Sequence, residues 1–248
     1  MRVGWLKRFM TQRWEDLLLL HWTVPQDSLR ATLPDDLELD LFEGEAWASV
    51  VGFKLTNLRI APLQWISWSD FWEVNLRTYV RNRQGQKGVW FHSLDSSDLL
   101  AVFGARSLYG LSYHYAQIHC SRKPKSIAYH SRRKSFLKTA KAQIFAEFPS
   151  DQNNPAPADS PLDRFLLERY RFWARRSFSS VSGDAQVMHR PYDAQELGLA
   201  SYHGELFKSQ GLKEPESEPV VAHYCKGFDV EASAPSWAFA MAGHANHR

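Results

Sequence analysis

Residues 71–80 read FWEVNLRTYV, and this stretch decides the fold because its side chains alternate with a period of two. One side carries Trp72, Val74, Leu76, Thr78 and Val80, and the other carries Glu73, Asn75, Arg77 and Tyr79. A period of two is typical of a β-strand. An ordinary sheet buries the Trp and Val side and exposes the Glu and Arg side, whereas a barrel around a ligand cavity reverses this. The stretch therefore predicts a strand, and either its apolar face or its polar face points into the protein.

The bulk composition is that of an ordinary soluble globular protein of 248 residues. Aromatic residues make up 14% of the chain, and ten are Trp, which suits β structure. The net charge of +3 is by itself too small to indicate a nucleic-acid partner. Two cysteines without a C-x-x-C spacing argue against a disulfide scaffold or a structural zinc site. With neither a signal sequence nor a membrane span, the sequence predicts a cytoplasmic protein.

Strand patterns outnumber helix patterns along the chain. We expect strands at 17–24, 37–42, 46–60, 71–81, 89–94, 113–119, 126–136 and 140–148. We expect helices at 25–33, at 95–110 with Asp95 or Ser96 as its cap, at 162–176 and near 203–210. Arg106 falls on the apolar stripe of the helix at 95–110. The polar, Pro-rich residues 149–161 predict a flexible loop within a single domain over 1–248.

Several segments resemble the YqjF-like family of uncharacterised bacterial proteins, which carry a domain of unknown function. These segments are WEDLLLLHWTVP, LRATLPDDLELDLFEGEAWASVV, FWEVNLRTYV, GVWFHSLDSSDLLAVFGAR, FLLERY and HYCKGFDV, and they span most of the chain. The family is in turn distantly similar to acetoacetate decarboxylase. That resemblance implies a mainly β, α+β fold: a single-domain, cone-shaped antiparallel barrel or curved sheet with a central cavity and helices packed outside.

The decarboxylase motif is only partly present. The motif reads Gly-Arg-Glu, two residues, Gly, one residue, Pro-Lys, and this chain has ARSLYGLSYH at 105–114. Arg106 and Gly110 match, but Ser107 replaces the Glu, Ser112 the Pro and Tyr113 the catalytic Lys. Schiff-base decarboxylation needs an amine nucleophile, which a phenol cannot supply. The resemblance therefore excludes imine chemistry at position 113. Lys54 is the alternative amine, although most lysines are solvated.

What the resemblance leaves is a candidate pocket with other chemistry. Glu73 matches an active-site carboxylate of the decarboxylase, and we assign Glu73 and Tyr113 as candidate catalytic residues. Beside an arginine, the Tyr113 phenol is expected to be more acidic than usual and to exchange a proton. The candidate ligand-binding residues are Asn75, Arg77, Tyr79 and Arg106. Two guanidinium groups around a cavity favour a carboxylate or phosphate, so the hypothesis is a site for a small organic anion, with no cofactor.

Two other classes of function stay open. The segment Arg122–Lys141 packs many cations together and could bind nucleic acid or an anionic membrane, although a solvated hairpin explains the same pattern. A structural or partner-binding protein with a filled barrel is the other alternative. The ten histidines show no H-E-x-x-H pattern, and we expect no metal. Whether the chain is an enzyme, and its oligomeric state, are not decided by the sequence.

Overall fold

The computed structural model describes residues 8–134, 139–149, 157–175, 179 and 182–238. The strands are β1 (Met10–Thr23), β2 (Leu37–Leu39), β3 (Trp47–Ile60), β4 (Phe71–Asn82), β5 (Lys87–Ser96), β6 (Tyr113–Lys123), β7 (Ser126–Arg133), β8 (Lys141–Glu147), β9 (Arg171–Ala174), β10 (Gly183–His189), β11 (Ala194–Glu196), β12 (Leu199–Gly204) and β13 (Val221–Ala232). The helices are α2 (Gln26–Arg30), α3 (Leu99–Tyr109) and α4 (Pro161–Leu167), with a 3-10 turn, η1, at Lys208–Gln210.

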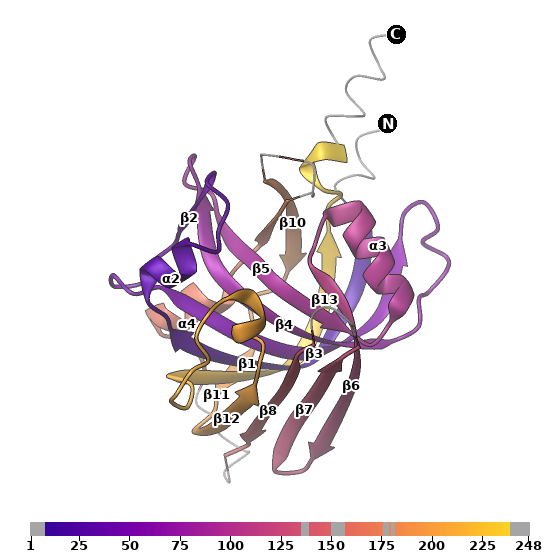
Figure 1. The fold of residues 1–248 in the computed structure, drawn as a ribbon. Helices are drawn as coiled ribbons and strands as arrows, with labels where there is room; N and C mark the ends of the chain where they lie inside the picture. The colour runs from indigo at the N-terminus through magenta and orange to yellow at the C-terminus, as the bar shows by residue number, and fades with distance from the viewer. Residues whose placement is uncertain (1–7, 135–138, 150–156, 176–178, 180–181, 239–248) are drawn as a thin grey trace.

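A closed barrel forms the centre of the molecule. Its strand order is β5-β9-β10-β13-β1-β3-β4, and β4 pairs back onto β5 to close the ring. Most pairs are antiparallel, but β5 runs parallel to β9 at Val89–Trp90 and to β6 at Leu94–Ser96. On the edge of β5 that does not pair with β4, the first residues pair with β9 and the last residues pair with β6. The sheet therefore divides at β5, and the branch that begins with β9 completes the barrel. The mainly β barrel expected from the sequence is confirmed (Figure 1).

The other branch is a four-stranded sheet, β6-β7-β8-β12, that packs on the outside of the barrel. A core lies between the two layers, and its members include Leu18, Leu20, Val50, Val74 and Leu76 of the barrel with Ile118, Ile127, Tyr129 and Ile144 of the outer sheet. A second core fills part of the barrel and includes Leu17, Leu19, Val51 and Phe53. Both faces of β1 are thus buried, which is why its sequence contains an unbroken run of leucines.

The orientation of β4 decides which of its two faces is enclosed. Val74 and Leu76 pack against the outer sheet, whereas Glu73, Asn75 and Arg77 point into the barrel. All three inward polar side chains are buried, and Glu73 is only 3% exposed. The second layer therefore covers the apolar face, and closure of the ring encloses the polar face.

Two expected helices are corrected by the structure. The helix predicted at 162–176 ends at Leu167, and Arg171–Ala174 is strand β9, which pairs with both β5 and β10. Pairing with two neighbours overrides the local helical periodicity, because strand formation depends on tertiary partners. The helix expected near 203–210 is the end of β12 followed by one 3-10 turn. Residues 150–156 of the loop expected at 149–161 lie outside the described part of the chain.

Helix α3 is bounded by an N-cap and a left-handed glycine. The Asp98 carboxylate accepts a hydrogen bond from the backbone of Ala101 at 2.6 Å, and Gly110 ends the helix with a φ of 66°. A side-chain acceptor at the N-cap and a glycine after the last turn are the usual boundaries of a helix. The cap is therefore Asp98 and not Asp95 or Ser96.

Gly52 lies where the outer sheet packs tightly against the barrel. A Cβ atom at this position of β3 would lie 2.7 Å from Ile144 Cδ1 and 2.9 Å from the Tyr129 ring. We expect Gly52→Ala to lower the free energy of unfolding by about 1–3 kcal/mol, as overpacking of a filled core does. Gly198→Ala is the control, because no atom lies within 4 Å of the added methyl group. Equal stability of the two variants in urea unfolding would contradict this packing.

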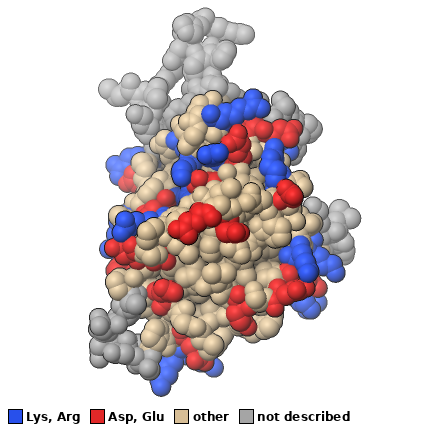
Figure 2. All heavy atoms as spheres, turned by 90° about the vertical axis from the view of Figure 1, so that its left-hand side faces the viewer, with Lys and Arg blue, Asp and Glu red and all other residues tan. Residues whose placement is uncertain are grey.

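The basic segment proposed for surface binding is partly engaged within the fold. The Arg122 guanidinium stacks 4.1 Å from the Phe148 ring centre and lies 3.5 Å from Asp16. Arg133 is buried against Asp95. On the face shown in Figure 2, basic and acidic side chains are interspersed among the described residues. Surface binding to nucleic acid stays a prediction. None of the helices in the described ranges is long and apolar enough to cross a membrane.

Candidate functional site

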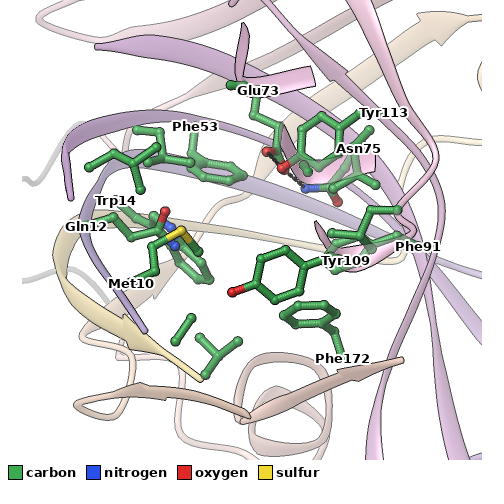
Figure 3. A pocket seen from close by; sticks show the side chains of 18 of the residues that line it. Met10, Gln12, Trp14, Phe53, Glu73, Asn75, Phe91, Tyr109, Tyr113 and Phe172 are labelled. Atoms are coloured by element: carbon green, nitrogen blue, oxygen red, sulfur yellow. Dashed lines mark hydrogen bonds between the residues drawn. The ribbon is translucent and has the colours of Figure 1, made fainter. Parts of the chain in front are cut away.

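The barrel interior encloses a cavity of about 150 Å³. Strands β1, β3, β4, β5 and β6 and helix α3 supply most of its wall (Figure 3). Most of the lining is apolar and includes Phe9, Met10, Trp14, Leu17, Val51, Phe53, Leu55, Trp68, Phe71, Val89, Phe91, Leu94, Ala101, Leu108, Leu111 and Phe172. The filled-barrel hypothesis required a solidly packed interior, and this cavity argues against it.

Glu73, Asn75 and Tyr113 form one hydrogen-bonded group on the cavity wall (Figure 3). The Tyr113 hydroxyl donates to Glu73 Oε2 at 2.5 Å, and Asn75 Nδ2 donates to Glu73 Oε1 at 2.9 Å. Glu73 and Asn75 share a face because they are two residues apart on β4, and Tyr113 reaches them from β6. A short O–H···O bond of this length is typical of a hydroxyl that donates to a carboxylate.

Burial sets the acidity of this group. Desolvation raises the pKa of Glu73 from its ordinary value of 4.5 to about 7, against the opposing effect of the hydrogen bonds from Tyr113 and Asn75. Burial and the adjacent Glu73 carboxylate raise the pKa of Tyr113 well above 10. The expectation of an acidic Tyr113 is therefore wrong, because its neighbour is a carboxylate and not an arginine. Glu73 is the member of the group that can change charge near neutral pH.

Arg77 is the third polar residue that β4 sends into the barrel, and among the described residues it forms no ion pair. Its side chain lines the cavity, and the residue is 7% exposed. Nη2 donates to the backbone carbonyl of Leu166 at a long 3.4 Å, and the buried Nε has no hydrogen-bond partner. Among the described residues, no carboxylate oxygen lies within 4.0 Å of this guanidinium. A buried cation without a counter-ion is costly, so an anion there would be strongly stabilised.

Two further arginines border the cavity, but both are already paired. Arg169 Nη1 lies 2.6 Å from Asp40 Oδ2, and Arg169 stacks on the Phe165 ring. Arg171 forms an ion pair with Asp184. These guanidinium groups therefore contribute little uncompensated charge. Sequence reasoning missed both, because the segment that carries them was expected to be helical.

The structure does not bring Arg106 to the site. Its side chain is exposed and is not part of the cavity wall, because α3 turns Ala101, Gly104 and Leu108 toward the cavity instead. The side of the helix that was expected to be apolar and to carry Arg106 also carries Phe103, which is 73% exposed. The expected stripe was therefore right for Val102 and Tyr109, which are buried, and wrong for Phe103 and Arg106, which are exposed. Lys54 lies on the opposite face of its strand from the interior and pairs with Asp70 at 2.8 Å.

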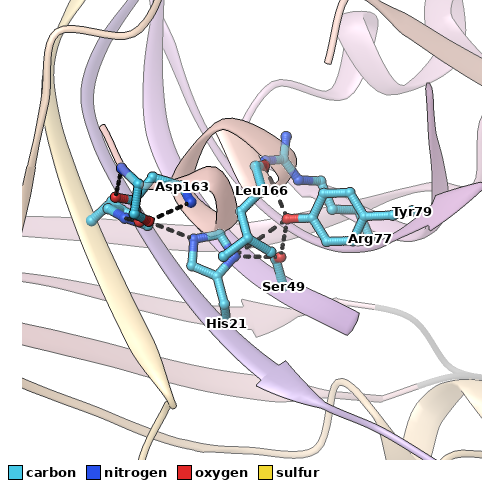
Figure 4. A network of polar contacts seen from close by, with 8 residues as sticks. His21, Ser49, Arg77, Tyr79, Asp163 and Leu166 are labelled. Carbon is cyan, nitrogen blue, oxygen red and sulfur yellow. Dashed lines mark hydrogen bonds and ion pairs between the residues drawn. The ribbon is translucent and has the colours of Figure 1, made fainter. Parts of the chain in front are cut away.

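Tyr79 belongs to a buried polar network that involves α4 and meets Arg77 at the Leu166 carbonyl (Figure 4). Its hydroxyl lies 2.7 Å from Ser49 Oγ and 3.1 Å from the Leu166 carbonyl. Ser49 Oγ lies 2.7 Å from His21 Nδ1, His21 Nε2 lies 3.1 Å from His223 Nδ1, and His223 Nε2 lies 2.9 Å from Asp163 Oδ1.

One proton arrangement satisfies the part of this chain from Asp163 to Ser49. The Asp163 carboxylate accepts from His223 Nε2–H, so His223 Nδ1 accepts from His21 Nε2–H, and His21 Nδ1 accepts from the Ser49 hydroxyl. Burial lowers the pKa of both histidines, and it lowers that of His21 well below 6.5. The network is therefore neutral apart from Asp163, and it fixes α4 to the barrel. No pattern in the sequence links these residues, because they lie on five separated elements, β1, β3, β4, α4 and β13.

Among the residues with described positions, no group of three or more His, Cys, Asp or Glu side chains is arranged to hold a metal ion. Within the same part of the chain, no lysine lines the cavity.

The barrel with its enclosed polar group defines an acetoacetate decarboxylase-like fold. Acetoacetate decarboxylase from Legionella pneumophila superposes with a TM-score of 0.58 at 14% identity, over 90% of this chain and 86% of that one. An acetoacetate decarboxylase-like enzyme from Sphingomonas wittichii gives 0.58 at 13%, over 92% and 93%. The enduracididine biosynthesis enzyme MppR, in complex with pyruvate, gives 0.57 at 12%, over 91% and 88%. At these identities the likeness establishes the fold alone.

The sequence itself places the chain more narrowly. Residues 11–229 match DUF2071, described as an uncharacterized conserved protein. The uncharacterized protein YqjF of Bacillus subtilis is 37% identical over 222 residues, which is 89% of each chain. The chain therefore belongs to the DUF2071 family, and the resemblance to YqjF expected from its segments is confirmed.

Proposed function

We propose that the barrel cavity binds a small organic carboxylate, with Arg77 as the anion-binding residue and the Glu73–Tyr113 pair as a proton-exchanging group. The observation that carries this proposal is the state of Arg77. It is a buried guanidinium at a cavity wall, with an unpartnered Nε and no carboxylate beside it among the described residues. A carboxylate can accept two parallel N–H bonds from a guanidinium, which makes it the best-matched ligand.

Glu73 supports an acid–base role at the same site. With a pKa raised to about 7, it exists in both protonation states near neutral pH, and Tyr113 Oη holds a hydrogen bond to it in either state. Asn75 fixes the second carboxyl oxygen and so orients the group. Because Tyr113 stands where the decarboxylase motif has its lysine, any reaction at this site proceeds without an imine at position 113.

The solved relatives fit this proposal in chemical class. One of them is an acetoacetate decarboxylase, and another was solved with pyruvate. Both compounds are small carboxylates. For this chain, a carboxylate ligand is inferred from Arg77, and the shared barrel supports the placement of the site.

The test compares carboxylates with their neutral amides in isothermal titration calorimetry. We expect hexanoate and phenylacetate to bind and hexanamide and phenylacetamide to bind at least about tenfold more weakly, because an amide carries no charge for Arg77. Arg77→Met should remove this preference and reduce carboxylate affinity by at least about tenfold.

Arg106→Met is the matched control, since it removes an arginine that lies outside the cavity wall. We expect it to leave the affinity unchanged. Removal of an unpaired buried charge should not unfold the protein, and the melting temperature of Arg77→Met checks this point. Carboxylate binding that survives Arg77→Met in a folded variant would overturn the proposal.

A further inference from the structure

We infer that the ligand of this cavity is a hydrophobic monocarboxylic acid, with an alkyl or aryl group of about benzene size, and not a short keto acid. This inference rests on the proposed function and adds the class of substrate. It follows from three observations: most polar groups of the cavity wall are hydrogen-bonded or ion-paired within the protein, the cavity is small, and its entrance is apolar.

Most polar groups that face the cavity are satisfied within the protein. Glu73 receives hydrogen bonds from Tyr113 and Asn75, and the Tyr109 hydroxyl donates to the Ser233 carbonyl at 2.9 Å. Arg169 and Arg171 are held in ion pairs. Of the charged groups in the wall, Arg77 is the one with a buried nitrogen that lacks a partner among the described residues. Two neutral atoms, Trp14 Nε1 and Asn75 Oδ1, also lack partners. One charge among apolar walls matches a ligand with one carboxylate and a hydrocarbon group.

The size of the cavity sets the size of the hydrocarbon. A dry apolar cavity of about 150 Å³ holds a benzene molecule, and the barrel cavity has about the same volume. The rings of Phe53, Phe91 and Phe172 face this space (Figure 3). A short polar keto acid would leave these rings in contact with trapped water, whereas a larger apolar group would bury them. The gain is about fourfold in affinity for each methylene group buried.

The entrance has the same apolar character. Helix α3 and the segment at 61–70 both contribute to the wall, through Leu100 and Trp68. Leu100 lines the cavity and is also 66% exposed, so it lies at the boundary between cavity and solvent. Several further large apolar side chains of these two segments are exposed: Leu63, Trp65, Ile66, Leu99 and Phe103. An apolar entrance favours the passage of a hydrophobic acid over that of a strongly hydrated one.

The test is an affinity series in calorimetry with acetate, butyrate, hexanoate, octanoate, dodecanoate and phenylacetate, with pyruvate and acetoacetate as short polar acids. We expect the affinity to rise about fourfold per methylene between butyrate and octanoate and to fall for dodecanoate. Hexanoate and phenylacetate should bind at least about tenfold more tightly than pyruvate. Pyruvate or acetoacetate binding as tightly as hexanoate would overturn this inference while leaving the proposed carboxylate site intact. Failure of every acid to bind would overturn both.

A variant that fills the cavity makes the size argument specific. Ala101 lines the cavity from α3, and Ala101→Leu places a larger side chain in that space. We expect the longest acid that binds well to shorten by about two to three carbons, with acetate affinity changed by less than about twofold. Ser107→Leu adds the same side chain to an exposed position of the same helix and should leave the series unchanged. An unaltered series for Ala101→Leu would place the ligand elsewhere and overturn the inference.

Discussion

Glu73→Gln is expected to make the protein more stable at pH 8, by about 3 kcal/mol. Burial raises the pKa of Glu73 from 4.5 to about 7, so the folded protein holds a proton that the unfolded chain releases between these values. The free energy of unfolding therefore falls as the pH rises through this interval, and it stays lower above pH 7. Glutamine carries no charge at any pH, and its oxygen can accept from Asn75 while its amide group donates to the Tyr113 oxygen, which reverses the direction of the Tyr113 bond.

The measurement is urea unfolding of the wild type and of Glu73→Gln at pH 5 and pH 8. At pH 5 the two proteins should differ by less than about 1 kcal/mol, because folded Glu73 is still protonated and unfolded Glu73 is only partly ionised. All other titratable groups are the same in the two proteins, so their contribution to the pH dependence of stability cancels in the difference between them. A difference of the same size at both pH values would contradict the raised pKa. Confirmation would mean that this carboxyl group is kept in the barrel at a loss of stability, as is common for functional groups.

Asp95→Ala is expected to lower the free energy of unfolding by about 3–5 kcal/mol. Asp95 Oδ1 lies 2.7 Å from Arg133 Nη2 and accepts a hydrogen bond from Arg133 Nε at 2.8 Å, and both side chains are fully buried. The Ser131 hydroxyl donates to the other carboxylate oxygen at 3.1 Å. These contacts join β5 of the barrel to β7 of the outer sheet. Loss of the carboxylate leaves the Arg133 charge buried without its counter-ion.

Two further variants test the physical reason for this loss. Glu38→Ala breaks the exposed pair with Arg81, whose atoms lie 3.2 Å apart, and should change stability by less than about 1 kcal/mol. The double variant Asp95→Leu with Arg133→Met removes both buried charges and should recover most of the lost stability. If the double variant is as unstable as Asp95→Ala, the loss comes from packing and not from an unpaired charge.

Sequence reasoning predicted the strands well and the short helices poorly. The pattern at 71–80 predicted β4 within two residues, and the polar turn after it predicted the hairpin with β5. The segment at 171–174 was expected to continue a helix, yet it closes the barrel as β9. Local periodicity describes a segment in isolation, whereas this short strand exists because two neighbouring strands offer it hydrogen bonds.

The candidate site was predicted in part, and there is a physical reason why some of its residues were predicted and others were not. The cavity is lined, as expected, by Glu73, Asn75, Arg77 and Tyr113. Tyr79 is instead buried in the hydrogen-bond network with Ser49. Arg106 was misplaced, because a helix with apolar residues on several sides does not indicate which side faces inward. Ser49, His223 and Asp163 were not singled out. They lie far apart in the sequence, and only the closure of the barrel brings them into hydrogen-bonding distance.

The sequence by itself determined that β4 has one polar and one apolar face, and that the lysine of the decarboxylase motif is replaced by Tyr113. Both are properties of residue order, which no folding event can alter. The tertiary structure alone decided that the polar face is enclosed, that Arg77 lacks a carboxylate partner among the described residues and that Glu73 titrates near neutral pH. These depend on burial and on distances across strands, because the energy of a charge is set by the groups and the solvent around it.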